Sequence, residues 1–227
     1  MSMFFIDLLF PKFCLGCSYL GVYLCPSCLR ELNSIKNDNC PYCNKASLFG
    51  LTHPNCSKTH GIDGSIAIYH YNPILKKIIK NIKYRLATDV WQEFYKVIEP
   101  RIILKLGFYK ELSPNLVIQP IPLSKLRYNE RGFNQAKIIS IFFQKFLHFP
   151  IVDLLIRKEE RLSQAQIKNK KIRYFNVTGA FSAIKFVPEN ILLIDDVITS
   201  GSTVKEAAKI LKEAGAKKVY ALALARG

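Results

Sequence analysis

Residues 191–203, which read ILLIDDVITSGST, constrain the fold more than any other part of this chain of 227 residues. Four consecutive aliphatic residues at its start are typical of a strand that is buried on both faces, as in a parallel α/β sheet. The adjacent acids Asp195 and Asp196 follow, and then comes a short hydroxyl-rich segment around Gly201. The next residues carry apolar side chains at helical spacing. The stretch therefore predicts a strand, an acidic pair, a small-residue loop and a helix in succession.

This succession is suited to binding a phosphorylated sugar. The backbone N–H groups of the loop and the positive end of the helix dipole favour an anion, and the Ser and Thr hydroxyls add donors. The acidic pair cannot bind that phosphate, but it suits a diol or a metal beside it. A sugar phosphate with free hydroxyl groups satisfies both halves at once. The candidate site comprises Asp195, Asp196, Thr199, Ser200, Gly201, Ser202 and Thr203.

The same stretch resembles the phosphoribosyl-pyrophosphate (PRPP) motif of type I phosphoribosyltransferases. The resemblance implies that Asp195 and Asp196, as the catalytic acids, hold the ribose 2′- and 3′-hydroxyls, while residues 199–203 wrap the 5′-phosphate. It also implies that PRPP binds together with Mg²⁺. A plain strand–turn–helix with capping Ser and Thr is the alternative, and the two acids directly before the loop argue against it.

A second loop is expected to hold the pyrophosphate. Residues 116–121 predict the first central strand, and residues 122–136 form a loop before a helix with apolar residues from Ile138 to Phe146. Arginine offers bidentate geometry to phosphate oxygens. We assign the basic residues of this loop, Lys125, Arg127 and Arg131, to pyrophosphate binding. Arg161 and Lys83, from other parts of the chain, are assigned to the same function. Residues 151–156 predict another strand, and residues 157–181 predict either a mobile lid or an exposed hairpin.

All seven cysteines lie within the first 56 residues, and six of them form CxxC pairs. Two thiolates at this spacing reach one tetrahedral zinc ion. The remaining Cys56 follows His53 at the same spacing, so His53 is the expected eighth ligand and His60 is the alternative. Two closed, structural zinc sites are predicted, with the ligands Cys14, Cys17, Cys25, Cys28, Cys40, Cys43, His53 and Cys56.

The zinc ligands allow two connectivities. Sequential pairing gives a double zinc ribbon, and cross-bracing joins the first pair to the third. We favour sequential pairing because the gaps between pairs are short. Metal binding would then supply much of the folding free energy of a module over residues 1–60. Residues 61–227 are expected to form the second domain, an α/β domain with a Rossmann-like parallel sheet flanked by helices.

The net charge of +16 is concentrated in the second domain. Residues 1–60 carry 5 basic and 3 acidic side chains, which leaves 28 basic and 14 acidic ones for residues 61–227. Such a field attracts nucleic acid, phosphorylated ligands or an anionic membrane face. The alternative is that an AT-biased genome inflates the lysine content.

The sequence also predicts where the protein is located. No run approaches the roughly 20 apolar residues of a membrane span, and the first residues lack the basic start and cleavage site of a signal peptide. Paired cysteines in such a chain indicate zinc in a reducing compartment. We expect a cytoplasmic protein, free or peripheral to the inner face of the membrane.

Several further segments narrow the resemblance to the ComF/GntX family of competence-type phosphoribosyltransferase-like proteins. They are the paired cysteines after an LLFP start, IKNIKY at residues 79–84, RGFNQA at 131–136, RLSQAQ at 161–166 and RYFNVTGAF at 173–181. They run in family order across essentially the whole chain. The chain departs from the family at His53, where other members generally carry a cysteine.

This resemblance implies a function in natural transformation. The protein would handle incoming single-stranded DNA on the cytoplasmic side, with a helicase-like translocase and a membrane channel as partners. One alternative is an enzyme that transfers phosphoribosyl from Mg–PRPP to a nitrogen acceptor such as a nucleobase. The other is a regulator that senses PRPP or binds nucleic acid through its zinc ribbons, and it predicts PRPP binding without turnover.

Overall fold

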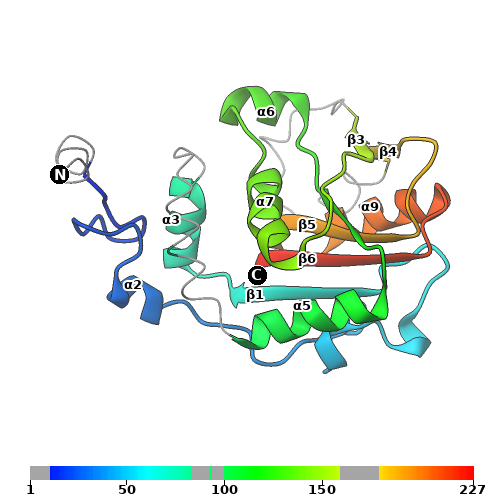
Figure 1. Ribbon diagram of the computed structural model, residues 1–227, viewed down its shortest axis with the longest axis horizontal. Helices are drawn as coiled ribbons and strands as arrows, with labels where there is room; N and C mark the ends of the chain where they lie inside the picture. Colours follow the sequence, from blue (N-terminus) through cyan, green and yellow to red (C-terminus); the bar gives the residue numbers. More distant parts are fainter. Residues whose placement is uncertain (1–10, 83–92, 94–99, 159–178) are drawn as a thin grey trace.

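A four-stranded parallel sheet forms the centre of the molecule (Figure 1). The computed structural model describes residues 11–82, 93, 100–158 and 179–227. The strands lie in the order β1-β6-β5-β2, and every neighbouring pair is parallel. Their bounds are β1 Gly64–His70, β2 Val117–Pro120, β5 Asn190–Ile198 and β6 Lys218–Arg226. The predicted α/β class is therefore confirmed.

Helices cover both faces of this sheet (Figure 1). One face packs against α3 (Pro73–Ile82), α5 (Pro100–Leu112) and α7 (Gln135–Leu147). The opposite face packs against α9 (Ser202–Glu213). Among the described residues, no helix is both long enough and apolar enough to cross a membrane.

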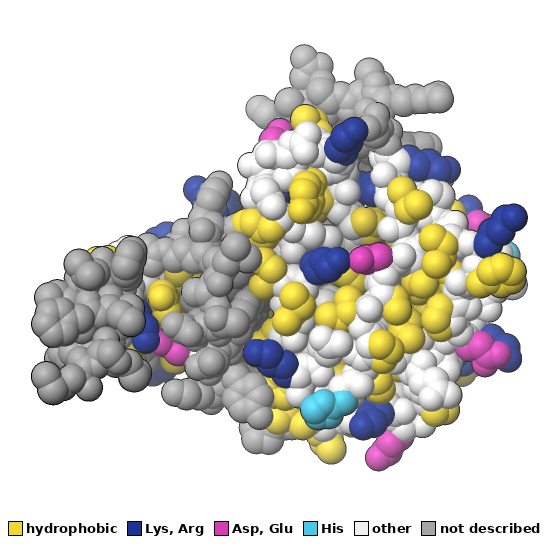
Figure 2. Space-filling view, turned by 45° about the horizontal axis from the view of Figure 1, so that its top comes forward, with side chains coloured by type: hydrophobic (Ala, Val, Ile, Leu, Met, Phe, Trp, Pro, Cys, Tyr) yellow, Lys and Arg dark blue, Asp and Glu magenta, His cyan; other side chains and the backbone are white. Residues whose placement is uncertain are grey.

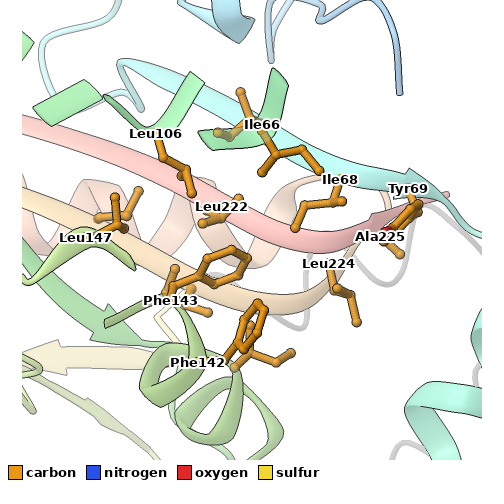
Figure 3. Close-up of a cluster of buried hydrophobic side chains, with 14 of the residues drawn as sticks. Ile66, Ile68, Tyr69, Leu106, Phe142, Phe143, Leu147, Leu222, Leu224 and Ala225 are labelled. Atoms are coloured by element: carbon orange, nitrogen blue, oxygen red, sulfur yellow. The ribbon is translucent and has the colours of Figure 1, made fainter. Parts of the chain in front are cut away.

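Strand β6 shows why both faces are apolar. Tyr220, Leu222 and Leu224 point to the side of α5 and α7, where they join Phe142 and Phe143 in one core (Figure 3). The alternate residues Val219, Ala221 and Ala223 point to α9. This two-residue alternation is the ordinary geometry of a strand. The small alanines meet Ala207 and Ala208 of α9, so strand and helix can approach closely.

The loop predicted at residues 122–136 contains a helix, α6 (Lys125–Arg131). Ser124 caps its start by accepting a hydrogen bond from the backbone N–H of Arg127. Gly132 ends it in the left-handed conformation, with φ 75°. Serine and glycine are ordinary start and stop signals for a helix. Both were present in the sequence, but the helix is too short to show a clear apolar periodicity.

Residues 151–156, predicted to be one strand, divide into two parts. Ile151 makes a single parallel bridge to Ile118 beside the main sheet. The side chain of buried Gln119 then accepts a hydrogen bond from the backbone N–H of Leu154, in place of a backbone partner. Beyond it, β3 (Leu155–Arg157) pairs antiparallel with β4 (Phe181–Ala183). The segment predicted as a lid or a hairpin thus begins and ends in an antiparallel pair, and its residues 159–178 lie outside the described part.

In the cysteine-rich segment, residues 11–60 of the described chain, three short helical turns are present: α2 (Pro26–Arg30), η1 (Leu48–Gly50) and η2 (Pro54–Cys56). It contacts the outer edge of the sheet, where Ser34 bridges to Tyr69 and Leu51 bridges to Gly64. Asp38 and Lys105 of α5 form a buried ion pair at 2.6 Å. A division of the chain near residue 60 stays a prediction.

Candidate PRPP and zinc sites

A cavity of about 180 Å³ opens at the carboxyl ends of β2 and β5. Helix α9 follows β5 and α7 follows β2 after the short α6, and these two long helices cover opposite faces of the sheet. Ligands of open α/β sheets bind at such a switch point, because the diverging connections leave a crevice there. The lining residues are Ile121, Leu123, Arg127, Arg131, Asn134, Gln135, Ala136, Arg157, Asp195, Asp196, Val197 and Thr203.

The acidic pair lies on the C-terminal half of β5, which continues past both residues to Ile198. Each carboxylate accepts a hydrogen bond from the next backbone N–H: Asp195 from Asp196, and Asp196 from Val197, both at 2.9 Å. Burial raises the pKa of Asp195 to about 8, and the charge of Asp196 acts in the same direction, while the guanidinium of Arg157 opposes it. A pKa of about 8 means that the carboxyl group of Asp195 titrates close to neutral pH in the ligand-free chain.

The hydroxyl-rich segment forms the turn between β5 and α9. Gly201 caps α9 with φ 72°, a left-handed conformation that favours glycine. The hydroxyl oxygens of Ser200 and Ser202 lie 2.8 Å apart in front of this helix start. Thr203 lines the cavity, whereas residues 199–202 lie beside it. The helix dipole and the exposed hydroxyl groups are features that favour an anion, so a phosphate site at this turn stays a prediction.

Two of the predicted basic residues reach the cavity. Arg127 and Arg131 are four residues apart on α6, so they lie on the same face of that helix and both line the cavity. Lys125 is exposed and is not among the lining residues, because α6 turns it to another side. Lys83 and Arg161 lie outside the described residues.

Three polar lining residues were missed as site residues in the sequence. Arg157 ends β3, and its guanidinium lies 5.4 Å from the ring centre of buried Phe181. Asn134 caps α7, and Gln135 is the first residue of that helix. The signal for the last two was available, since both belong to the RGFNQA segment that precedes a helix. Arg157 carried no comparable signal, because its position depends on the β3–β4 pairing.

The first cysteine group gathers Cys14, Cys17, Cys25 and Cys28, with all sulfur atoms within 4.8 Å of one another. Tetrahedral zinc with bonds of about 2.3 Å places its sulfurs about 3.8 Å apart. Ser18, the residue after the first pair, has φ 65°, and Asn44 after the third pair has φ 59°. Each of these two CxxC turns is thus followed by a residue in the left-handed conformation.

The second group gathers Cys40, Cys43, His53 and Cys56 within the same distance. His53 Nδ1 lies 3.3 Å from the sulfur of Cys43, and Nε2 lies 3.0 Å from the carbonyl oxygen of Ala46. A carbonyl that accepts from one ring nitrogen leaves the other free to bind a metal. The described His60 is not part of the group. The grouping is sequential, as in a double zinc ribbon, and not cross-braced.

The thiols are poised for a cation. Burial alone raises the pKa of Cys40, but the backbone N–H groups of Cys43, His53 and Tyr42 outweigh it and lower that pKa to about 6. Burial and the neighbouring Cys43 and Cys40 raise the pKa of Cys56 to about 11. Cys40 therefore loses its proton readily, and the negative charge of its thiolate opposes the deprotonation of Cys56. A divalent cation removes that repulsion, so both groups fit structural zinc sites.

Comparisons with known proteins agree with this geometry. Residues 143–227 match the phosphoribosyl transferase domain family. Competence protein ComFC of Streptococcus pneumoniae is 32% identical over 210 residues, which cover 89% of this chain and 87% of that protein. Competence protein F of Haemophilus influenzae is 26% identical, covering 89% and 90%. ComFC of Bacillus subtilis is 26% identical, covering 85% and 79%.

The fold and the family match define a protein with a phosphoribosyltransferase-type domain and with cysteine groups of the zinc-ribbon kind at its N-terminal end. Within that class, the chain belongs to the ComF family.

Proposed function

We propose that the cavity at the carboxyl ends of β2 and β5 binds PRPP together with Mg²⁺. The observation that carries this proposal is the acidic pair at the cavity wall, directly before the Gly201-capped start of α9. The turn at residues 199–203 would bind the 5′-phosphate, and Asp195 and Asp196 would hold the ribose hydroxyls. Carboxylate oxygens also suit Mg²⁺, which would neutralise charge on the pyrophosphate when bound.

Calorimetric titration of PRPP with Mg²⁺ tests this site. The wild type should bind, and the double substitution Asp195→Ala/Asp196→Ala should abolish binding while the fold and the zinc content persist. Asp153→Ala is a matched control, because this acid pairs with Lys137 on the surface and lies outside the cavity lining. A folded, zinc-loaded wild type that binds no PRPP would refute the proposal.

We further propose that the protein acts in natural competence and handles single-stranded DNA on the cytoplasmic side, at the inner face of the membrane when joined to an uptake apparatus. Support comes from the names of its relatives, which are competence proteins, and from the net charge of +16. On the face in Figure 2, Lys and Arg side chains are dispersed among hydrophobic and acidic ones. DNA binding that depends on this net charge would be electrostatic and independent of the DNA sequence.

Phosphoribosyl transfer to a nitrogen acceptor is the second candidate function. It is favoured by the acidic pair, the Gly201-capped turn and the cavity arginines at one site, because the arginines could neutralise the charge on a leaving pyrophosphate. The apolar residues Ile121, Leu123 and Val197 line the cavity and offer a wall for a flat acceptor. A Mg²⁺-dependent release of pyrophosphate with any of a panel of nucleobases, nucleotides or DNA would establish it. A PRPP-binding protein that releases none would match a regulator.

A further inference from the structure

Gln135 stands out among the residues of the cavity because its amide is buried and half satisfied. The residue is 5% exposed and contributes to the cavity lining. Its Oε1 accepts a hydrogen bond from Nη1 of Arg131 at 3.1 Å. Its Nε2 has no hydrogen-bond partner among the described residues. A buried donor without an acceptor is unfavourable, and such a group in a binding cavity indicates a ligand atom that completes it.

The orientation of this amide is determined by its neighbour. A guanidinium has only donors, so the end of the Gln135 side chain that faces Arg131 must be the oxygen. The NH₂ end must therefore face away from Arg131. This end requires an acceptor, and a ligand group with only donors would leave it unsatisfied.

The neighbouring polar side chain at this helix start, that of Asn134, already has its hydrogen-bond partners. Asn134 caps α7 by accepting from the backbone N–H of Ala136 at 3.0 Å, and its Nδ2 donates to the carbonyl oxygen of Ile121 at 2.9 Å. The second bond connects the start of α7 to Ile121, the residue that follows β2. Gln135, by contrast, has a side-chain donor with no acceptor among the described residues.

The charge around the amide defines the chemistry of that ligand. Arg127, Arg131 and Arg157 line the same cavity. The anion site at residues 199–203 belongs to the other helix, α9, on the far side of the acidic pair. Two anion sites separated by a pair of carboxylates match a ligand with two phosphorylated ends.

We infer that Gln135 is a ligand-binding residue whose Nε2 donates to an oxygen of the pyrophosphoryl group, at a subsite formed with Arg127 and Arg131. This inference rests on the proposed PRPP site and adds a residue that selects an acceptor at the pyrophosphoryl end. Arg131 positions the amide, and Gln135 contacts the ligand.

The test uses full-length, zinc-loaded protein and three probes with Mg²⁺: PRPP, pyrophosphate and ribose 5-phosphate. Gln135→Glu keeps the acceptor for Arg131 and replaces the donor by a carboxylate oxygen. Gln135→Met removes the amide without adding charge. Both variants should weaken pyrophosphate and PRPP at least about tenfold and leave ribose 5-phosphate within about twofold of the wild type.

The control is Asn115→Asp, the same change from amide to acid at an exposed residue near the start of β2, at the opposite end from the cavity. It should leave all three affinities unchanged. The thermal midpoint of each variant shows whether it is folded. An equal loss of ribose 5-phosphate binding would indicate a purely structural residue and overturn the inference.

The outcomes separate this inference from the proposed function. If the wild type binds PRPP and both Gln135 variants bind PRPP and pyrophosphate equally well, the inference is wrong and the PRPP site stands. If pyrophosphate binding depends on Gln135 but PRPP does not bind, the inference holds and the proposed function is wrong. If the wild type binds neither compound, both are wrong.

Discussion

His53 is the residue at which this chain departs from an all-cysteine ligand set. Its two ring nitrogens have different partners, since Nε2 lies against the carbonyl of Ala46 and Nδ1 faces Cys43. A neutral imidazole held in this way can bind the metal through the lone pair of Nδ1, in the position of a fourth thiolate. The carbonyl of Ala46 therefore fixes the orientation of the His53 ring without binding the metal itself.

Substituting His53 should reduce the zinc content. We expect His53→Ala to lower zinc from two ions per chain to one, and His60→Ala to leave both, because His60 is not part of the second ligand group. Elemental analysis of the purified proteins measures the stoichiometry. His53→Cys should keep two ions, since it restores a fourth thiolate. Two ions in His53→Ala would assign the eighth ligand elsewhere.

Asp195 should make the ligand-free protein less stable as the pH rises. Its pKa is raised from the ordinary 3.8 to about 8 in the folded chain, so the folded state retains a proton that the unfolded state has lost. Stability is therefore lost as the pH rises through this window, and the loss is complete above about pH 8. Asp195→Asn removes the titration. We expect a gain of about 1–3 kcal/mol at pH 9, or roughly 3–10 °C in thermal midpoint, and little gain at pH 5.

Thermal unfolding of the zinc-loaded wild type and Asp195→Asn across pH 5 to 9 checks this expectation. Parallel pH profiles of the two proteins would contradict the raised pKa. Asp153→Asn, at an exposed acid, is the control and should follow the wild type.

At the scale of single residues, the sequence located part of the cavity. The acidic pair and Thr203 were accessible because they lie in one contiguous motif whose geometry is local. Arg127 and Arg131 were also named, but Lys125 was grouped with them because the helix that separates their directions was not predicted. Arg157 reaches the cavity through a strand pairing between residues 155–157 and 181–183. Such a long-range contact leaves no pattern in the sequence.

At the scale of elements, strongly periodic segments were predictable and short ones were not. The strands β2 and β5 are buried on both faces, and their aliphatic residues predicted them at residues 116–121 and from residue 191 onward. Helices α7 and α9 showed apolar faces. The strand at residues 151–156 was misjudged, because the amide of Gln119 takes the hydrogen bond that a continuing ladder would have used. Side-chain hydrogen bonds of this kind depend on tertiary structure.

A buried ion pair connects the cysteine-rich segment to α5. Asp38 and Lys105 lie 2.6 Å apart, with side chains 3% and 5% exposed. The second oxygen of Asp38 has no partner among the described residues. Desolvation of both charges opposes the pair, so its net value is small, but an unpaired charge left in the same place is costly.

Removing one partner should therefore destabilise more than removing both. We expect Asp38→Ala to cost about 3–5 kcal/mol, because it leaves the ammonium of Lys105 buried and unpaired. The double substitution Asp38→Leu/Lys105→Met should cost less than the single one. Urea unfolding of zinc-loaded protein measures both. A double variant that loses as much stability as Asp38→Ala, or more, would contradict this expectation.

At the scale of the whole molecule, the charge distribution is the feature that the fold does not explain. The net charge of +14 over residues 61–227 exceeds what three cavity arginines require. If it serves DNA, binding should be governed by counterion release. For roughly five phosphate contacts on a single strand, affinity should fall about 100-fold between 50 and 200 mM salt. If the lysines are only a consequence of genome composition and form no path for a strand, binding at 50 mM salt should be weak.

Fluorescence anisotropy with a labelled 20-mer of deoxythymidine distinguishes the two explanations. An uncharged peptide nucleic acid of the same sequence is the control, because it keeps the bases and lacks the phosphates. Binding of DNA but not of this analogue, with a steep salt dependence, would support the DNA-handling function. Saturating PRPP should leave the affinity unchanged if the DNA follows a surface outside the cavity, and should lower it if strand phosphates occupy the arginine subsite. Absence of DNA binding at 50 mM salt would refute the DNA-handling function and leave the PRPP site to be judged on its own titration.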